Sequence, residues 1–136
     1  MNLPQVSYDD LLDKVELTMH EIGTTEFDTS GFLCNGIYVR SIYIPAGSYL
    51  TSKIHATDHP FVLSQGVITI FTEDGGEQVL EAPYIDITKA GTRRFARAET
   101  DCLWSTFHRT DKETEEEIEK EVIISRVNPL LIKEIS

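Results

Sequence analysis

Between Gly36 and His108 the chain alternates apolar and polar side chains in short runs, and no run in this interval has the spacing of a helix. Successive side chains of a strand point to opposite faces, so a period of two predicts strands with one buried face. Turn-forming residues separate the runs: Pro45–Gly47, Asp74–Gly76, Ala82–Pro83, Ala90–Gly91 and Glu99–Asp101. Many short strands at this spacing predict an antiparallel sandwich or barrel.

We expect eight strands in this interval, with bounds taken from the alternation. They are Ile37–Ile44, Tyr49–His55, Phe61–Leu63, Val67–Thr72, Gln78–Leu80, Tyr84–Thr88, Arg94–Ala98 and Leu103–His108. With a two-residue turn at Glu99–Thr100, the last two strands pair as a hairpin and His108 lies opposite Gly91.

Helical patterns flank the alternating region. Ser7 and Asp10 form an N-capping pattern, and the apolar residues that follow as far as Met19 have helical spacing. Thr110 and Glu113 form a second capping pattern. A narrow apolar stripe follows it, made of Ile118, Val122 and Ile123.

The chain of 136 residues is long enough for one domain with a real core and too short for two. We divide it into an N-terminal helical segment over 1–35, a β-barrel over 36–110, and a C-terminal helix with an apolar tail over 111–136. The tail contains Pro129–Ile132, which is too apolar to stay in water. It is expected to pack on the domain or on a neighbouring subunit.

The net charge of −11 limits the classes of partner. An acidic chain repels phosphate backbones and anionic lipids, so we expect neither a nucleic acid nor a membrane as a partner. Residues 111–121 hold seven acidic residues against two lysines. This run is expected to be the solvated face of the C-terminal helix.

The two cysteines, Cys34 and Cys102, have no Cys-x-x-Cys spacing, and no signal-peptide pattern begins the chain. The longest apolar stretches are far shorter than a membrane span. We therefore expect a cytoplasmic protein in a reducing compartment. Both cysteines are expected to be buried small hydrophobic residues rather than partners in a disulfide.

Two of the four histidines, His55 and His59, stand four residues apart between two expected strands. Asp58 and Pro60 argue against a helix there, and four extended residues span about 13 Å, which is too far for one metal ion. The two imidazoles converge only if the chain bends between them. Otherwise they are solvent-exposed turn residues.

His108 is the third candidate. Three histidines from separate strands make a facial metal site or, alternatively, the polar floor of a pocket. His20, near the end of the first helix, is interpreted as a favourable charge at a helix C-terminus and not as a site residue.

These residues resemble the first motif of the cupin superfamily, in which a glycine leads to His-x-His, three or four residues, a glutamate, six residues and a second glycine. Between Gly47 and Gly66 this chain has Lys53 at the first histidine position, His55 at the second and His59 at the glutamate position. The usual ligand set is therefore altered within a familiar outline.

The second cupin motif, Pro-x-Gly-x-x-His, is altered too, because Lys89 replaces the proline and Arg94 replaces the histidine. A closer resemblance is to short cupin-like proteins of tailed phages and prophages, over about residues 36–122. It rests on these runs: Tyr43–Gly47, Lys53–His55, His59, Thr72–Gly75, Glu81–Pro83, Gly91–Arg94 and Asp101–His108. The resemblance implies a mainly β, single-domain cupin, a double-stranded β-helix of jelly-roll type with a helix at each end. It also implies a phage-encoded protein of the host cytoplasm or of the virion.

In such a barrel Lys53, His55, His59, Arg94 and His108 gather at one end as a cationic pocket, and the mouth of a small barrel is a common ligand site. Lysine and arginine favour carboxylates, phosphates or sugar acids.

Trp104 shares a strand face with His108, so it is either an apolar wall of this pocket or a core residue that fills the barrel. Tyr49 shares a strand face with Lys53. The candidate ligand-binding residues are Lys53, Arg94, Trp104 and Tyr49. The candidate ligands of a divalent metal, which would be zinc, iron or manganese, are His55, His59 and His108.

Three functions fit this pattern. The first is a module that binds a small anionic molecule, with or without a metal. The second is a structural or assembly protein of a virion, such as a capsid decoration or tail component. The third is an enzyme, either metal-dependent or sugar-modifying, which in the sugar-modifying case needs a histidine base, a carboxylate such as Asp58 and a tyrosine acid. A homo-oligomer assembled through sheet edges is expected in each case.

Overall fold

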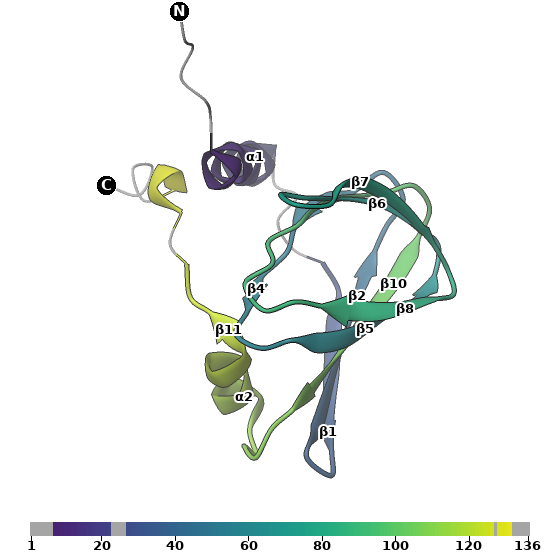
Figure 1. The fold of residues 1–136 in the computed structure, drawn as a ribbon, viewed down its shortest axis with the longest axis vertical. Helices are drawn as coiled ribbons and strands as arrows, with labels where there is room; N and C mark the ends of the chain where they lie inside the picture. Colours follow the sequence, from purple (N-terminus) through teal and green to yellow (C-terminus); the bar gives the residue numbers. More distant parts are fainter. Residues whose placement is uncertain (1–6, 23–26, 127, 132–136) are drawn as a thin grey trace, which may run out of the picture.

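Two facing β-sheets, flanked by helices, form the body of the molecule (Figure 1). The computed structural model describes residues 7–22, 27–126 and 128–131. The helices are α1 (Tyr8–Ile22) and α2 (Glu115–Val122). The strands are β1 (Thr29–Cys34), β2 (Ile37–Ile44), β3 (Tyr49–Thr51), β4 (Ile54–His55), β5 (His59–Gln65), β6 (Val67–Thr72), β7 (Gly76–Glu81), β8 (Tyr84–Thr88), β9 (Phe95–Ala98), β10 (Cys102–Arg109) and β11 (Ile123–Ile124).

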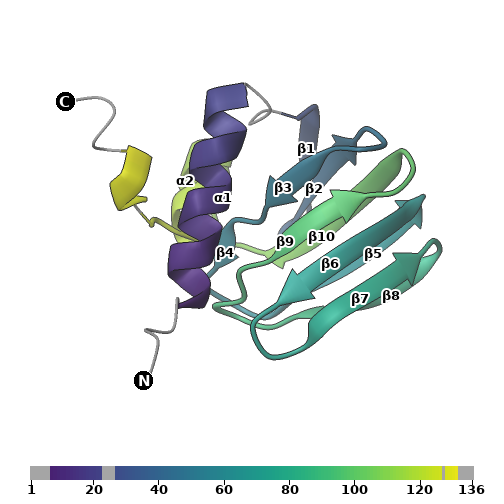
Figure 2. The same cartoon turned by 90° about the horizontal axis from the view of Figure 1, so that it is seen from above.

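The first sheet has the strand order β1-β2-β10-β5-β8 and the second has the order β3-β9-β6-β7. Neighbouring strands are antiparallel, and β4 pairs with β11 in a separate short ladder. In Figure 2 one sheet lies behind the other and α1 runs across one end of their strands. The mainly β jelly-roll architecture with a helix near each end confirms the expected fold class. The main core consists of Ile44, Phe61, Leu63, Ile68, Ile70, Leu80, Ala96, Ala98 and Cys102.

Three of the expected strands match β2, β6 and β8 residue for residue, and four others differ from β5, β7, β9 and β10 only at their ends. The strand expected over Tyr49–His55 is divided into β3 and β4 by Ser52 and Lys53. Strand β1 was not predicted. All six of its residues are exposed, so it has no alternation between buried and exposed positions that a sequence pattern could reveal.

The expected hairpin between the last two strands is wrong. Strand β9 pairs with β3 and β6, whereas β10 pairs with β2 and β5, so the link through Glu99–Asp101 crosses from one sheet to the other. Hydrogen bonds hold this crossing, since the backbone N–H groups of Glu99 and Thr100 donate to the Val67 carbonyl. His108 therefore lies opposite Tyr38 on β2 and not opposite Gly91.

Capping explains where each helix begins. The Ser7 hydroxyl accepts the Asp10 N–H at 3.0 Å, which confirms the first expected cap. The second cap is Thr114, whose hydroxyl accepts the Glu117 N–H at 3.3 Å, and not Thr110. Thr110 is buried and its N–H donates to the Gly36 carbonyl at 2.9 Å, so it still belongs to the barrel.

Helix α2 buries the narrow apolar stripe that its sequence predicts. Ile118 and Val122 are buried and pack against Tyr38 of β2, with Ile123 at their edge. The acidic residues of this helix are exposed. The run of negative charge is therefore a solvated face, as expected.

A buried cluster of charges joins α1 to the barrel and to the C-terminal segment. Asp13 of α1 is 2% exposed and accepts hydrogen bonds from Arg93 at 2.9 Å and from Arg126 at 2.6 Å. The Asn128 side chain donates to the Asp13 carbonyl at 3.0 Å. Burial raises the pKa of Asp13, but the hydrogen bonds from the two arginines outweigh it and the pKa is lowered.

The described part of the tail, residues 128–131, therefore packs on the domain through Asn128, whereas Ile132 lies outside the described residues. Both cysteines are free. The expectation of burial is right for Cys102 and wrong for Cys34, which lies on the exposed strand β1. No described helix has the length and apolar character needed to cross a membrane.

We predict that Asp13→Asn lowers the free energy of unfolding by about 2 kcal/mol, because it removes the buried carboxylate that Arg93 and Arg126 share, although Arg93 keeps its other carboxylate partners on α1. Urea denaturation at pH 7 measures the change. The matched control is Asp10→Asn on the exposed side of the same helix, which is expected to change stability by less than about 0.5 kcal/mol. Equal stabilities for the two variants would contradict the assignment of Asp13 as the central charge.

Candidate metal centre and adjoining cavity

Three buried histidines converge at one end of the barrel. His55 ends β4, His59 begins β5 and His108 lies near the end of β10. The ring centroids are separated by 4.3 Å between His55 and His59, 4.6 Å between His59 and His108, and 5.1 Å between His55 and His108. One ligand nitrogen from each ring lies within 4.8 Å of the others. The structure thus brings together the three metal-ligand candidates taken from the sequence.

The convergence depends on a bend between β4 and β5, as the spacing of His55 and His59 requires. The Ala56 N–H donates to the Val122 carbonyl at 2.8 Å, and the Gly91 N–H donates to the His55 carbonyl at 2.9 Å. On the other side of the bend, the Asp58 carboxylate accepts the Ala90 N–H at 2.8 Å. These bonds hold the bend that brings the two ring centroids to 4.3 Å, whereas four extended residues span about 13 Å.

Hydrogen bonds leave free nitrogens on at least two of the rings. His59 Nδ1 lies 3.2 Å from the Thr57 carbonyl, which can only accept, so Nδ1 carries the proton and Nε2 keeps its lone pair. His108 Nε2 lies 2.9 Å from the Thr106 hydroxyl. When Nε2 donates to that hydroxyl, Nδ1 is left as a buried acceptor, and it has no partner within the described part of the chain. A second contact that fixes the tautomer is usual for metal-ligating histidines.

The three imidazoles are held neutral. Burial, followed by the nearby charges of His59 and His108, lowers the pKa of His55 to about 3. Burial and the charge of His59 lower the pKa of His108 to about 4. Burial also lowers the pKa of His59, against the opposing effect of its bond to the Thr57 carbonyl. A neutral imidazole is the form that binds a metal ion, so protons do not compete at neutral pH.

The donor set fits a divalent transition metal. Two nitrogens on a tetrahedral zinc ion, at a zinc–nitrogen distance of 2.0–2.1 Å, are about 3.4 Å apart. The nitrogens here lie within 4.8 Å of one another, so metal binding requires the rings to close by up to about 1.4 Å. Three imidazoles also leave coordination positions for a further ligand.

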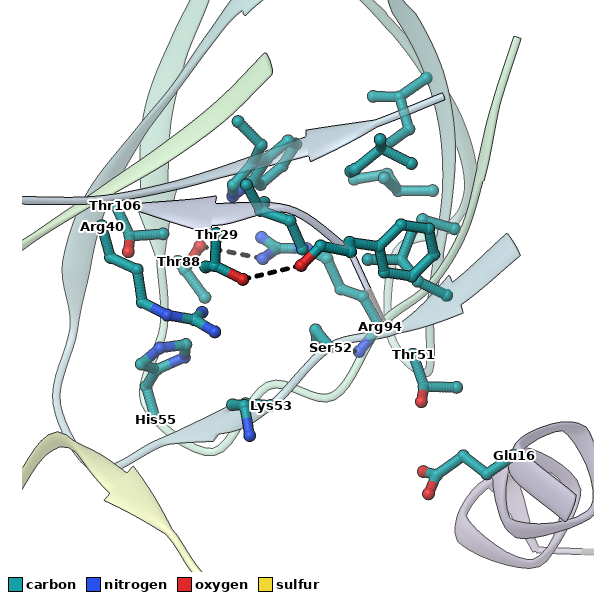
Figure 3. Close-up of a pocket in the computed structure, with 18 of the residues that line it drawn as sticks. Glu16, Thr29, Arg40, Thr51, Ser52, Lys53, His55, Thr88, Arg94 and Thr106 are labelled. Carbon is teal, nitrogen blue, oxygen red and sulfur yellow. Dashed lines mark hydrogen bonds between the residues drawn. The ribbon is translucent and has the colours of Figure 1, made fainter. Parts of the chain in front are cut away.

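A cavity of about 630 Å³ adjoins the histidines. Figure 3 shows Arg40 of β2, His55 of β4 and Arg94, which precedes β9, reaching into the same hollow, with Glu16 of α1 at its edge. His55 and His59 line this cavity, and His108 does not reach its surface. The apolar part of the lining consists of Met19, Phe27, Ile42, Ile44, Leu50, Ile68, Ile70, Ala96, Trp104 and Leu131.

The cavity is cationic although the protein is acidic. Among the described residues, the one acidic side chain in its lining is that of Glu16, whose carboxylate pairs with Arg93. In the described part of the chain, Arg40, Lys53 and Arg94 form no ion pair. This arrangement attracts a negatively charged molecule to the cavity.

The sequence-predicted ligand-binding residues divide into two groups. Lys53, Arg94 and Trp104 line the cavity, with Lys53 exposed at its edge. Trp104 is both a wall and a packing residue, since its ring stacks on Phe61 at 4.2 Å. Tyr49 lies outside the lining, 45% exposed and stacked on Phe95, because the chain leaves the strand geometry after β3.

Several residues of the cavity lining were missed from the sequence, among them Arg40, Thr88 and His20, which was interpreted as a helix-terminal charge and not as a site residue. Arg40 lies on β2 on the same strand face as Tyr38 and Ile42. A cation at an inward-facing position of an apolar strand could have identified it as a cavity residue. Thr88 was missed because a threonine in a strand has no distinctive pattern. It lies directly opposite His59 in the β5–β8 ladder, and its hydroxyl accepts a hydrogen bond from Arg94 at 2.9 Å.

Comparison with solved structures shows a cupin, double-stranded β-helix fold. Ectoine synthase from P. lautus superposes with a TM-score of 0.58 at 14% identity, covering 78% of this chain and 80% of that one. A cupin-2 domain protein from Shewanella frigidimarina gives 0.50 at 12% identity, with 73% and 97% covered. Salicylate 1,2-dioxygenase from Pseudaminobacter salicylatoxidans gives 0.53 at 13%, covering 76% of this chain and 33% of that one. Neither the family models nor the curated proteins that were compared match the sequence.

The depressed histidine pKa values predict acid sensitivity of the metal-free protein. Above pH 6.5 the histidines are neutral in both states, and below it the unfolded chain takes up protons that the folded protein excludes. Stability is therefore lost as the pH falls from 6.5 towards the pKa values that the histidines have in the folded protein. Each excluded proton costs up to about 1.4 kcal/mol per pH unit.

Urea unfolding at pH 7.5 and pH 5.5, with chelator present, measures this loss. In His55→Asn, which removes one of the three groups, we expect the loss to be smaller by about 1 kcal/mol. An identical loss in the variant and the wild type would show that His55 is not held neutral by the fold.

Proposed function

We propose that this protein binds one divalent transition metal ion on His55, His59 and His108, and that a small anionic ligand occupies the cavity beside it. The observation that carries the proposal is the convergence of three buried, neutral imidazoles with their ligand nitrogens within 4.8 Å of one another. Buried polar nitrogens without partners are rare in native proteins, and metal coordination gives His108 Nδ1 the partner it lacks among the described residues.

The donor chemistry narrows the metal. Imidazole nitrogens suit zinc and iron, whereas manganese prefers oxygen ligands. The described cluster offers three imidazoles and no carboxylate. We therefore rank zinc and iron ahead of manganese, which the sequence had left equal.

Catalysis at the same metal is the second candidate function. A metal bound there supplies a Lewis acid that polarises an oxygen atom of a ligand. His55 and His59 line the cavity, so such a ligand lies next to the site. Two structural neighbours are named for enzymes, ectoine synthase and salicylate 1,2-dioxygenase, which is compatible with this candidate.

The metal-free sugar-modifying reaction has less support. It needs a carboxylate beside the histidine base and a tyrosine acid. Asp58 instead accepts from Ala90 and pairs with Lys89 at the protein surface. Tyr43 and Tyr49 are 36% and 45% exposed and lie outside the cavity lining.

Phage origin, a place in a virion and assembly into a homo-oligomer stay predictions from the resemblance. Mass determination of the protein in solution tests the oligomer, and its presence in purified particles tests the virion.

We predict that protein purified without a histidine tag binds about one zinc or iron(II) ion per chain. Each single alanine substitution of His55, His59 or His108 should lower metal affinity more than about 10-fold. Substitution of a residue that only hydrogen-bonds a metal ligand already has an effect of this size. Elemental analysis after reconstitution and a chelator competition measure content and affinity.

The control for this experiment is His20→Ala, which removes an exposed histidine of α1 outside the cluster and should leave metal content unchanged. Failure of the wild-type protein to bind either ion, or retention of metal by all three cluster variants, would refute the metal site.

A further inference from the structure

Arg94 carries a positive charge into the apolar part of the cavity. Its guanidinium carbon lies 5.3 Å from the centroid of the Phe61 ring and 5.7 Å from that of the Trp104 ring. No Asp or Glu side chain of the described residues comes within ion-pair distance of it. A half-buried cation without a counter-ion is unfavourable, and burial accordingly lowers the pKa of Arg94.

The guanidinium has one edge bound to the protein and one edge free. Nη1 donates to the Thr88 hydroxyl at 2.9 Å, which fixes the plane of the group beside His59. Nε is buried and has no partner within the described part of the chain. No described hydrogen bond uses Nη2 either. The N–H groups of Nε and Nη2 are parallel, and their spacing matches the two oxygens of a carboxylate.

Most neutral polar side chains of the lining already form a hydrogen bond within the described part of the chain, and Thr51 is the exception. The Thr29 hydroxyl donates to the Phe27 carbonyl, the Ser52 hydroxyl accepts the Arg94 backbone N–H, and the Thr106 hydroxyl bonds His108. A sugar or sugar phosphate would leave several of its hydroxyls without partners here, which costs affinity.

The remaining walls are apolar and close to the two aromatic rings. Ile42 of the first sheet and Ile70 of the second both line the cavity. A volume of about 630 Å³ is within the range of small-molecule sites. The cavity therefore suits a molecule with one anionic end and an apolar body.

The geometry points to Arg94 as a carboxylate subsite for small monocarboxylates with an apolar body, seated on the Nε and Nη2 edge. This subsite rests on the anionic-ligand part of the proposed function and is independent of the metal, because every group that forms it belongs to Arg94, its aromatic neighbours and the isoleucine walls. The position that holds a metal-ligating histidine in the cupin motif thus has a different task in this chain.

Isothermal titration calorimetry on chelator-treated protein tests the ligand class. The probes are benzoate and octanoate as carboxylates, benzamide as the neutral analogue of benzoate, and inorganic phosphate and glucose 6-phosphate as anions without an apolar body. We expect both carboxylates to bind, and benzamide to bind at least about 10-fold more weakly than benzoate. Tighter binding of either phosphate than of the carboxylates, or no binding of the carboxylates, overturns the inference.

Arg94→Met and Arg94→Lys test the residue, with the exposed Arg109→Met as the control. Both Arg94 variants should lose at least about 10-fold in carboxylate affinity. Methionine removes the charge, and lysine keeps the charge but lacks the two parallel N–H groups of the guanidinium. Arg109→Met should bind as the wild type does. Unchanged carboxylate binding in Arg94→Met overturns the inference.

A thermal melt of ligand-free protein separates binding from structure. Since Arg94 has no counter-ion among the described residues, Arg94→Met should melt at the same temperature as the wild type or higher. A structural arginine would give a lower melting temperature in that variant, and this result overturns the inference.

Metal content distinguishes the two proposals. Arg94→Met should keep the metal of the wild type, and His108→Ala, whose side chain lies outside the cavity lining, should keep carboxylate binding while it loses the metal. Carboxylate binding that depends on Arg94 in a protein without metal supports the subsite and refutes only the metal function. Metal binding without carboxylate binding refutes only the subsite.

Discussion

The ion cluster around Asp13 is the contact on which the arrangement of the cavity depends. It joins three segments that are distant in sequence: α1, the turn before β9, and the chain after β11. Arg93 and Arg94 are adjacent in sequence, and their side chains have different partners. The Arg93 side chain bonds the carboxylates of α1, whereas the Arg94 side chain lines the cavity. The ion pairs of Arg93 that hold α1 against the barrel therefore also fix the backbone of the next residue, Arg94, whose charge lies in the cavity.

Burial has two different consequences for the ionisable groups at this end of the molecule. It removes the charge of the three histidines at neutral pH, because an imidazole can release its proton at little cost. It leaves Arg94 charged, because a guanidinium does not lose its proton in this pH range. The same apolar environment thus contains neutral histidines and a charged arginine. The two kinds of group are neighbours, because Arg94 bonds Thr88, which lies opposite His59.

Alternation predicted most of the strands because the two sheets bury one face each, and it failed at β1, where all six residues are exposed. The convergence of His55 and His59 was predicted only on condition of a bend, since the backbone bonds that make it come from Val122 and Gly91. His108 was placed against the wrong strand because local pairing does not reveal that a short link crosses between sheets. Arg40 could have been recognised as an inward cation, whereas the free edge of Arg94 depends on Thr88, a contact that no sequence pattern specifies.

The histidines and the arginine belong to different layers of the fold. His59 and His108 stand on the first sheet, while Arg94 leads into β9 of the second and bonds Ser52 beyond β3. The Arg94 side chain therefore crosses from the second sheet to Thr88 of the first, and its reach depends on the distance between the layers, about 10 Å in packed sheets. A substitution at an interior position outside the cavity lining, such as Ala98, changes that distance and with it the position of the guanidinium beside His59. In evolutionary terms, the selectivity of this barrel is encoded partly in the volumes of its core residues.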